Sequence, residues 1–186
     1  MSDKVFCIGF QKTGTSSLAK ALQGLGFTVG DAIRVLNREV NWRALDPRPE
    51  IVEKVLAVVE NVDAIQDSPC AFVFRELDAA HPGAKFILTL RDTETWLESY
   101  RRFFPDQNNP LRRWMFGVDG LSGNEAKYRE VYNTQNASII DYFADRPDDL
   151  LVMKLENGDG WLKLVNFLGE GALKPFPHAN KGKSVL

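Results

Sequence analysis

The sequence predicts a three-layer α/β fold, in which helices cover both faces of a mostly parallel sheet of four or five strands. Short apolar runs alternate along the chain with segments of helical apolar spacing, and this alternation is typical of parallel strands joined by crossover helices. The length of 186 residues suits one domain that buries about 70% of its unfolded surface. We therefore expect residues 1–186 to form a single domain.

The composition argues against several classes of protein. A net charge of −2 with 26% charged residues does not suggest a nucleic-acid binder. No apolar run approaches the 18 residues of a membrane span, and the start MSDKVFCIGF has no secretion signal. Cys7 and Cys70 are too few for a disulfide framework, and no cluster of His, Cys and acidic residues argues for a metal. We expect a cytoplasmic protein without a metal site.

In the first third of the chain, two strands and two helices are expected. Residues 5–8 form a continuous apolar run, which is typical of a strand buried on both faces, and residues 15–25 carry a helical apolar stripe. Residues 27–29 are a candidate second strand. Residues 31–49 show no clean period, so we expect an irregular, substrate-facing loop there. Residues 51–59 return to helical spacing.

In the middle of the chain the same alternation continues. Residues 62–67 predict a short strand that ends on an acid. A helix over residues 72–80 follows and stops at His81-Pro82-Gly83. Residues 85–90 are the clearest strand in the sequence, and residues 93–104 predict a helix with its large apolar side chains on one side.

The last third begins with a turn-rich segment, residues 105–123. A helix over residues 124–144, a strand over 150–153 and a helix over 161–168 are expected after it. A basic patch near the turn-rich segment fits either a solvated surface or a lid over an acidic ligand; it consists of Arg101, Arg102, Arg112 and Arg113, with Trp114 and Phe116 interleaved.

The first strand leads into a candidate phosphate loop, GFQKTGTS. A loop bounded by Gly9 and Gly14, followed by hydroxyl residues and a helix, directs free backbone N–H groups at a phosphate. The frame resembles the NTPase loop GxxxxGK[ST], but Thr15 stands where that loop has lysine, and Lys12 is the only lysine within GFQKTGTS. The alternative is an ordinary βα turn without a ligand, although such a turn needs neither the lysine nor three consecutive hydroxyls.

Three polar residues follow carboxyl ends of predicted strands: Lys12, Asp67 and Arg91. Ligands of open α/β sheets bind beyond these strand ends, so we expect the three to converge. An arginine fork suits phosphate, and Ser99, two helical turns on, returns to roughly the same side. A surface salt bridge with Asp92 or Glu94 is the alternative for Arg91. His81 precedes a strand, so it is expected at the opposite rim.

Two of these motifs together resemble the sulfotransferase family. KTGTSSL is similar to its 5′-phosphosulfate loop, K-[ST]-G-T-[ST], and Arg91 with Ser99 is similar to its 3′-phosphate motif. The resemblance implies a P-loop-like fold and the sulfuryl donor 3′-phosphoadenosine 5′-phosphosulfate, which leaves as adenosine 3′,5′-bisphosphate, with an unidentified acceptor as partner. The donor-binding residues that it implies are Lys12, Thr13, Gly14, Thr15, Ser16, Ser17, Arg91, Ser99 and Lys181.

The resemblance also implies two catalytic roles. Lys12 would stabilise charge on the bridging oxygen as the sulfur–oxygen bond breaks. Asp67 stands where sulfotransferases carry the base that activates the acceptor, although an aspartate of ordinary pKa near 4 is a weak base unless its environment raises that pKa. Asp67 as a helix cap or turn former is the alternative. The tail, residues 173–186, is expected on or near the nucleotide site, where Lys181 would stand for a basic element at the 3′-phosphate.

Two other functions stay open at this point. A small kinase or NTPase would use the same loop, with Asp67 or Asp92 holding Mg²⁺; Thr15 in place of the loop lysine argues against it. A non-catalytic nucleotide-binding protein would keep the fold without the base.

Overall fold

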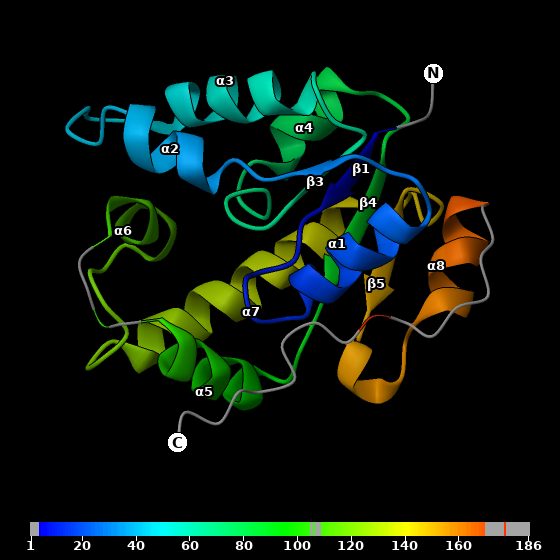
Figure 1. Ribbon diagram of the computed structural model, residues 1–186. Helices are drawn as coiled ribbons and strands as arrows, with labels where there is room; N and C mark the ends of the chain where they lie inside the picture. Colours follow the sequence, from blue (N-terminus) through cyan, green and yellow to red (C-terminus); the bar gives the residue numbers. More distant parts are fainter. Residues whose placement is uncertain (1–3, 105, 107–108, 170–176, 178–186) are drawn as a thin grey trace.

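The computed structural model describes residues 4–104, 106, 109–169 and 177. Its centre is a five-stranded sheet in which all neighbouring strands are parallel (Figure 1). The strands lie in the order β2 (Val29–Gly30), β3 (Ala64–Gln66), β1 (Val5–Cys7), β4 (Lys85–Thr89) and β5 (Leu150–Met153). The predicted three-layer α/β fold is therefore confirmed.

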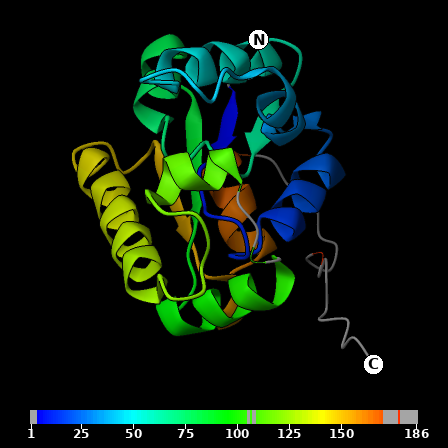
Figure 2. The same cartoon turned by 90° about the vertical axis from the view of Figure 1, so that its left-hand side faces the viewer.

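Helices form the outer layers. On one face of the sheet lie α1 (Thr15–Gly24) and α8 (Trp161–Leu168), and on the other lie α3 (Arg48–Val59), α4 (Phe74–Ala80) and α7 (Glu125–Tyr142) (Figure 1). Among the described residues there are three further α-helices, α2 (Ile33–Glu39), α5 (Thr93–Phe103) and α6 (Pro110–Phe116), and one short 3-10 helix, η1 (Leu155–Asn157). Figure 2 shows the same arrangement from the side.

The central strand β1 separates two hydrophobic clusters. Val5 and Cys7 face α1 and α8, where they join Leu22 of α1. Phe6 points to the other face, where its ring centroid lies 5.2 Å from that of Phe86. Because successive side chains of a strand point to opposite faces, a run of apolar residues is needed to fill both clusters. Cys7 and Cys70 are buried free thiols.

Two segments predicted as irregular contain helices. Residues 31–49 include α2, whose Leu36 is fully buried with Val40 one turn further on. Residues 105–123 include α6, which begins at Pro110 because the Asn109 side chain accepts a 3.0 Å hydrogen bond from the Arg112 N–H, and ends at Gly117 with φ 73°. Both helices have only seven residues, so their apolar periods were too short to stand out.

The remaining elements follow the prediction closely. β5 and α8 have the predicted bounds, and α3, α5 and α7 begin or end within a few residues of them. His81 is the C-cap of α4, and its ring centroid lies 5.5 Å from that of Phe6. As expected, His81 lies before β4, at the rim of the sheet opposite the phosphate loop. Within the described part of the chain, no helix is both long and apolar enough to cross a membrane.

Candidate functional site

The loop between β1 and α1 has two residues in left-handed backbone conformation. Gly14, the N-cap of α1, has φ 105°, and Lys12 has φ 73°. The positive φ of Gly14 favours glycine, and a Cβ atom there would lie 2.4 Å from Cδ1 of Leu155, so the Leu155 side chain would have to shift for any larger residue. A lysine backbone rarely adopts a positive φ, so contacts of the loop with the rest of the fold must hold Lys12 in this conformation.

Side chains from neighbouring elements hold this loop. The Thr13 hydroxyl donates to the Phe10 carbonyl and lies 2.6 Å from the Thr89 hydroxyl. The indole N–H of Trp96, in α5, donates a 2.9 Å hydrogen bond to the Gln11 carbonyl. Thr13 also uses its N–H within the loop, at 3.3 Å from the Phe10 oxygen. The predicted phosphate contact of the Thr13 hydroxyl is therefore not favoured, because that hydroxyl is buried and used inside the fold.

The groups left for an anion begin at Gly14. In the described part of the chain, the N–H groups of Gly14, Thr15 and Ser16 make no hydrogen bond. Free N–H groups in the first turn, together with the helix dipole, attract an anion. The start of α1 therefore offers these three backbone donors and the exposed Ser16 side chain to an anion.

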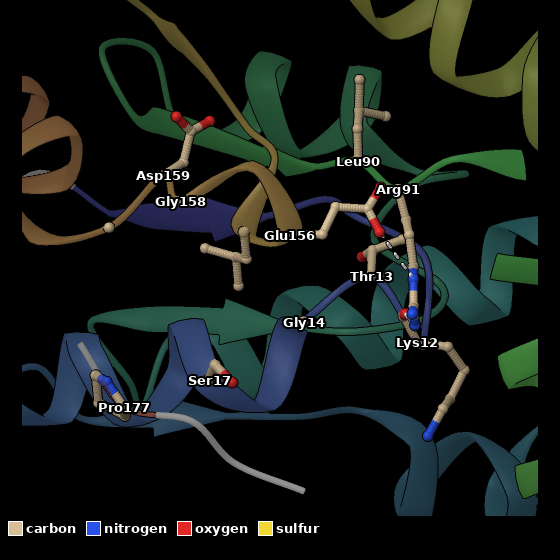
Figure 3. A pocket seen from close by; sticks show the side chains of 12 residues that line it. Lys12, Thr13, Gly14, Ser17, Leu90, Arg91, Glu156, Gly158, Asp159 and Pro177 are labelled. Atoms are coloured by element: carbon tan, nitrogen blue, oxygen red, sulfur yellow. Dashed lines mark hydrogen bonds and ion pairs between the residues drawn. The ribbon is translucent and has the colours of Figure 1, made fainter. Parts of the chain in front are cut away.

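The predicted site residues converge on one cavity. A cavity of about 260 Å³ lies beside the loop. Its walls include Lys12, Thr15, Ser16, Ser17, Asp67, Arg91 and Ser99, with Phe103 and Phe104. An adjoining cavity of about 450 Å³ shares Lys12, Gly14, Ser17 and Arg91 and extends to residues beyond β5 (Figure 3). The predicted meeting of Lys12, Asp67 and Arg91 is therefore confirmed.

Lys12 points away from Arg91 and toward the last turn of α5. Its Nζ lies 3.5 Å from the ring centroid of Phe103, whose side chain is 59% exposed. Figure 3 shows the lysine side chain extending from the loop away from the Arg91 guanidinium. Burial and the charge of Arg91 lower the pKa of Lys12, whereas the nearby Asp67 opposes that shift. The ammonium is thus already partly desolvated at the cavity.

Asp67 occupies the turn after β3. It has φ 74°, and its Oδ1 accepts a 2.8 Å hydrogen bond from the Ser68 N–H. Burial, reinforced by the charge of Asp31, raises the pKa of Asp67 to about 6. Lys12 and Asp67 are the non-glycine residues with positive φ in the described part of the chain. Such conformations cost roughly 1–3 kcal/mol each and gather at functional sites.

Arg91 does not pair with Asp92 or Glu94. Its Nε lies 3.2 Å from the Glu156 carboxylate. The Asp92 side chain instead caps α5 by accepting from the Thr95 N–H, and Glu94 pairs with Arg129. The salt-bridge alternative therefore named the wrong partners, while the guanidinium keeps its place at the cavity.

Some site residues were missed from the sequence. Glu156 lies three residues after β5, so the rule that ligands bind beyond strand ends would have pointed to it. Asp31 directly follows β2, so the same rule would have pointed to it as well, whereas Phe103 reaches the site through tertiary packing. Lys181 lies outside the described residues. Pro177, which belongs to the predicted tail 173–186, lines the 450 Å³ cavity, and the rest of that tail is also outside the described residues.

The fold and this loop define an α/β protein of the P-loop type. A family model described as a sulfotransferase domain matches residues 4–122 and 110–185. The chain belongs to the sulfotransferase family, as the two sequence motifs suggested.

Relatives and solved structures extend this comparison. Over 106 residues the chain is 33% identical to Ava biosynthesis cluster protein M of Aspergillus versicolor; the match spans 52% of the chain and 41% of that relative. A sulfotransferase from Alicyclobacillus acidocaldarius has a TM-score of 0.52 at 15% identity, covering 91% of this chain and 81% of that one. A gluconokinase from Sinorhizobium meliloti 1021 has a TM-score of 0.51 at 13% identity, covering 90% and 89%. The two structures share the fold.

Proposed function

We propose that the protein transfers a sulfuryl group from 3′-phosphoadenosine 5′-phosphosulfate to an acceptor hydroxyl or amine. One observation carries this proposal: the start of α1, Lys12, Asp67, Arg91 and Ser99 surround the same cavity. That set contains two cations and several hydroxyls for a doubly phosphorylated nucleotide, and one acid of raised pKa for the acceptor.

The residues present fit the donor. The N–H groups of Gly14, Thr15 and Ser16 and the hydroxyls of the first turn would hold its 5′-phosphate. Arg91 and Ser99 would hold its 3′-phosphate, because both line the 260 Å³ cavity and the guanidinium fork matches phosphate oxygens. When bound, the donor supplies the sulfuryl group and a phosphate leaving group.

Lys12 and Asp67 would divide the chemistry. The acceptor oxygen or nitrogen forms its bond to sulfur while the bond between sulfur and the bridging oxygen breaks. The acceptor proton goes to the Asp67 carboxylate, whose pKa near 6 keeps it mostly ionised at neutral pH while making it a better base than an ordinary aspartate. The Lys12 ammonium would stabilise the negative charge that gathers on the bridging oxygen.

The ligand that stabilises the fold tests this function. Adenosine 3′,5′-bisphosphate should raise the melting temperature without added metal, whereas ADP and ATP should do little. At about 100 times its dissociation constant, the expected gain is about 2.7 kcal/mol. Thermal-shift measurements with and without Mg²⁺ check it. A strong Mg²⁺-dependent shift with ATP alone would instead support a kinase or NTPase.

Replacing Arg91 with alanine tests the 3′-phosphate assignment. Losing hydrogen bonds to a charged group costs on the order of 1.5–3 kcal/mol, so affinity for adenosine 3′,5′-bisphosphate should fall roughly 10- to 100-fold. Affinity for adenosine 5′-phosphate should change little. Titration calorimetry measures both. Arg129→Ala, which removes an arginine paired with Glu94 on the surface, is the matched control. Equal losses for both nucleotides in Arg91→Ala would contradict the assignment.

A further inference from the structure

Glu156 contacts the end of β4 at two points. It lies in the short 3-10 helix η1 (Leu155–Asn157), one residue after the end of β5. One carboxylate oxygen, Oε2, lies 3.2 Å from Nε of Arg91, and the other, Oε1, accepts a 2.9 Å hydrogen bond from the Asp92 N–H. A single carboxylate therefore holds both the side chain and the following peptide group at the strand end that carries the arginine.

A second residue, Tyr132, fixes the backbone of Arg91. The Tyr132 hydroxyl, in α7, accepts from the Arg91 N–H at 3.0 Å and donates to the Arg91 carbonyl at 2.9 Å. The Tyr132 ring is buried and stacks on Trp96 with centroids 4.0 Å apart. Because the main chain is clamped in this way, the freedom left to Arg91 lies in its side chain, and Glu156 is the charged group that contacts it.

The contact of Glu156 leaves the phosphate-binding edge of the guanidinium available. Arginine has five N–H donors, and Glu156 takes the one at Nε. Nη1 lies 3.4 Å from the Lys12 carbonyl, and for Nη2 no hydrogen bond exists among the described residues. Figure 3 shows the carboxylate reaching Arg91 from the turn after β5, while the end of the guanidinium lies near the phosphate loop. Glu156 and a phosphate would therefore use different sides of the same group.

The local charge favours this role. Arg91 and Lys12 are close enough for the arginine to lower the pKa of the lysine, so two cations share the cavity wall. Without Glu156, repulsion from Lys12 and the entropy of a long side chain would both spread the guanidinium over several positions. Asp159, the other acid that lines the 450 Å³ cavity, is used elsewhere, since it accepts from the Lys154 N–H at 2.7 Å and pairs with Lys163.

We propose that Glu156 is a positioning residue that selects for the 3′-phosphate of the nucleotide by holding the Arg91 guanidinium toward the phosphate loop. The inference rests on the proposed donor, because the arginine is given a 3′-phosphate to bind. Glu156 touches the arginine and not the phosphate. Its contribution should therefore vanish once the arginine is removed.

The test is a double-mutant cycle on nucleotide affinity. Glu156→Gln keeps an oxygen for the Asp92 N–H but removes the charge that orients Arg91. Calorimetry should show about 5- to 50-fold weaker binding of adenosine 3′,5′-bisphosphate, with adenosine 5′-phosphate nearly unchanged. In an Arg91→Ala background, Glu156→Gln should have no further effect. Glu156→Asp, which keeps the charge on a shorter side chain, should lose less, and it serves as the second variant if the glutamine variant does not fold.

Three results would overturn the proposal. Tighter binding of the bisphosphate by Glu156→Gln would mean that Glu156 competes with the phosphate. Equal weakening of both nucleotides would mean a general structural role. An undiminished effect in the Arg91→Ala background would mean that Glu156 acts independently of the arginine. The wild-type arm separates this inference from the proposed function: if the wild type does not prefer the bisphosphate over adenosine 5′-phosphate, the donor assignment fails as well.

Discussion

Replacing Lys12 with methionine should lower sulfuryl transfer by about 10²–10³-fold, the usual cost of removing one preorganised group that meets developing charge. The methionine side chain is unbranched and nearly as long as that of lysine. Both residues carry a Cβ atom, so the substitution does not change how readily the backbone adopts φ 73°. The variant should also bind the donor more weakly, because Lys12 lines both cavities beside the start of α1. The measurement is release of adenosine 3′,5′-bisphosphate from the donor in the presence of a panel of alcohols, phenols and amines.

Lys20→Met is the matched control for this variant. Lys20 belongs to the same helix that the phosphate loop leads into, and its side chain is exposed. The control removes the same charge from α1 without touching the cavity, so its turnover should match the wild type. If Lys12→Met turns over as fast as Lys20→Met, Lys12 does not stabilise the leaving oxygen. A wild type that binds the bisphosphate but transfers to no acceptor would favour a non-catalytic nucleotide-binding protein.

The sheet and the site edge were predictable because they follow from strong local patterns. The four consecutive apolar residues 5–8, which contain β1, fill two clusters at once, and a parallel sheet brings the ends of its strands to one edge. That rule predicts from the sequence that Lys12, Asp67 and Arg91 lie together. It would have placed Glu156 there too, had it been applied to β5 as well as to the earlier strands.

What the sequence did not reveal depends on contacts between distant segments. The Asp67 carboxylate has a raised pKa because the fold buries it, and the charge of Asp31, which is 36 positions away, adds to that shift. Phe103 meets Lys12 because α5 ends beside the phosphate loop. The Thr13 hydroxyl was expected on a phosphate, but β4 presents Thr89 to it. Spacing predicts which elements form, and packing decides which polar groups remain free.

Asp67→Asn should lower turnover by about 10²–10⁴-fold, the range for loss of a general base, while nucleotide affinity stays unchanged. Asparagine keeps the oxygen that accepts from the Ser68 N–H and tolerates the left-handed backbone, so the turn itself should persist. If Asp67 only shapes that turn, the substitution is nearly silent. Asp92→Asn is the matched control, because Asp92 also follows a strand but caps α5, where asparagine serves equally well. A loss in Asp92→Asn with Mg²⁺-dependent ATP binding would instead favour the kinase alternative.

The pH dependence gives Asp67 a second, independent signature. A base must be ionised, so wild-type turnover should rise with pH through about 6, the raised pKa of Asp67, and Asp67→Asn should lack that rise.

Ionisation of Asp67 should have the opposite effect on the free energy of unfolding. Because the folded pKa lies above the unfolded value near 4, ionised Asp67 opposes folding, and the contribution of Asp67 to stability should become less favourable as pH rises from about 4 through 6. Urea unfolding at pH 8 should therefore find Asp67→Asn more stable than the wild type, and the difference should shrink toward pH 4. A variant that is less stable than the wild type at pH 8 would show that the Asp67 charge is satisfied within the fold and is not held ready for an acceptor proton.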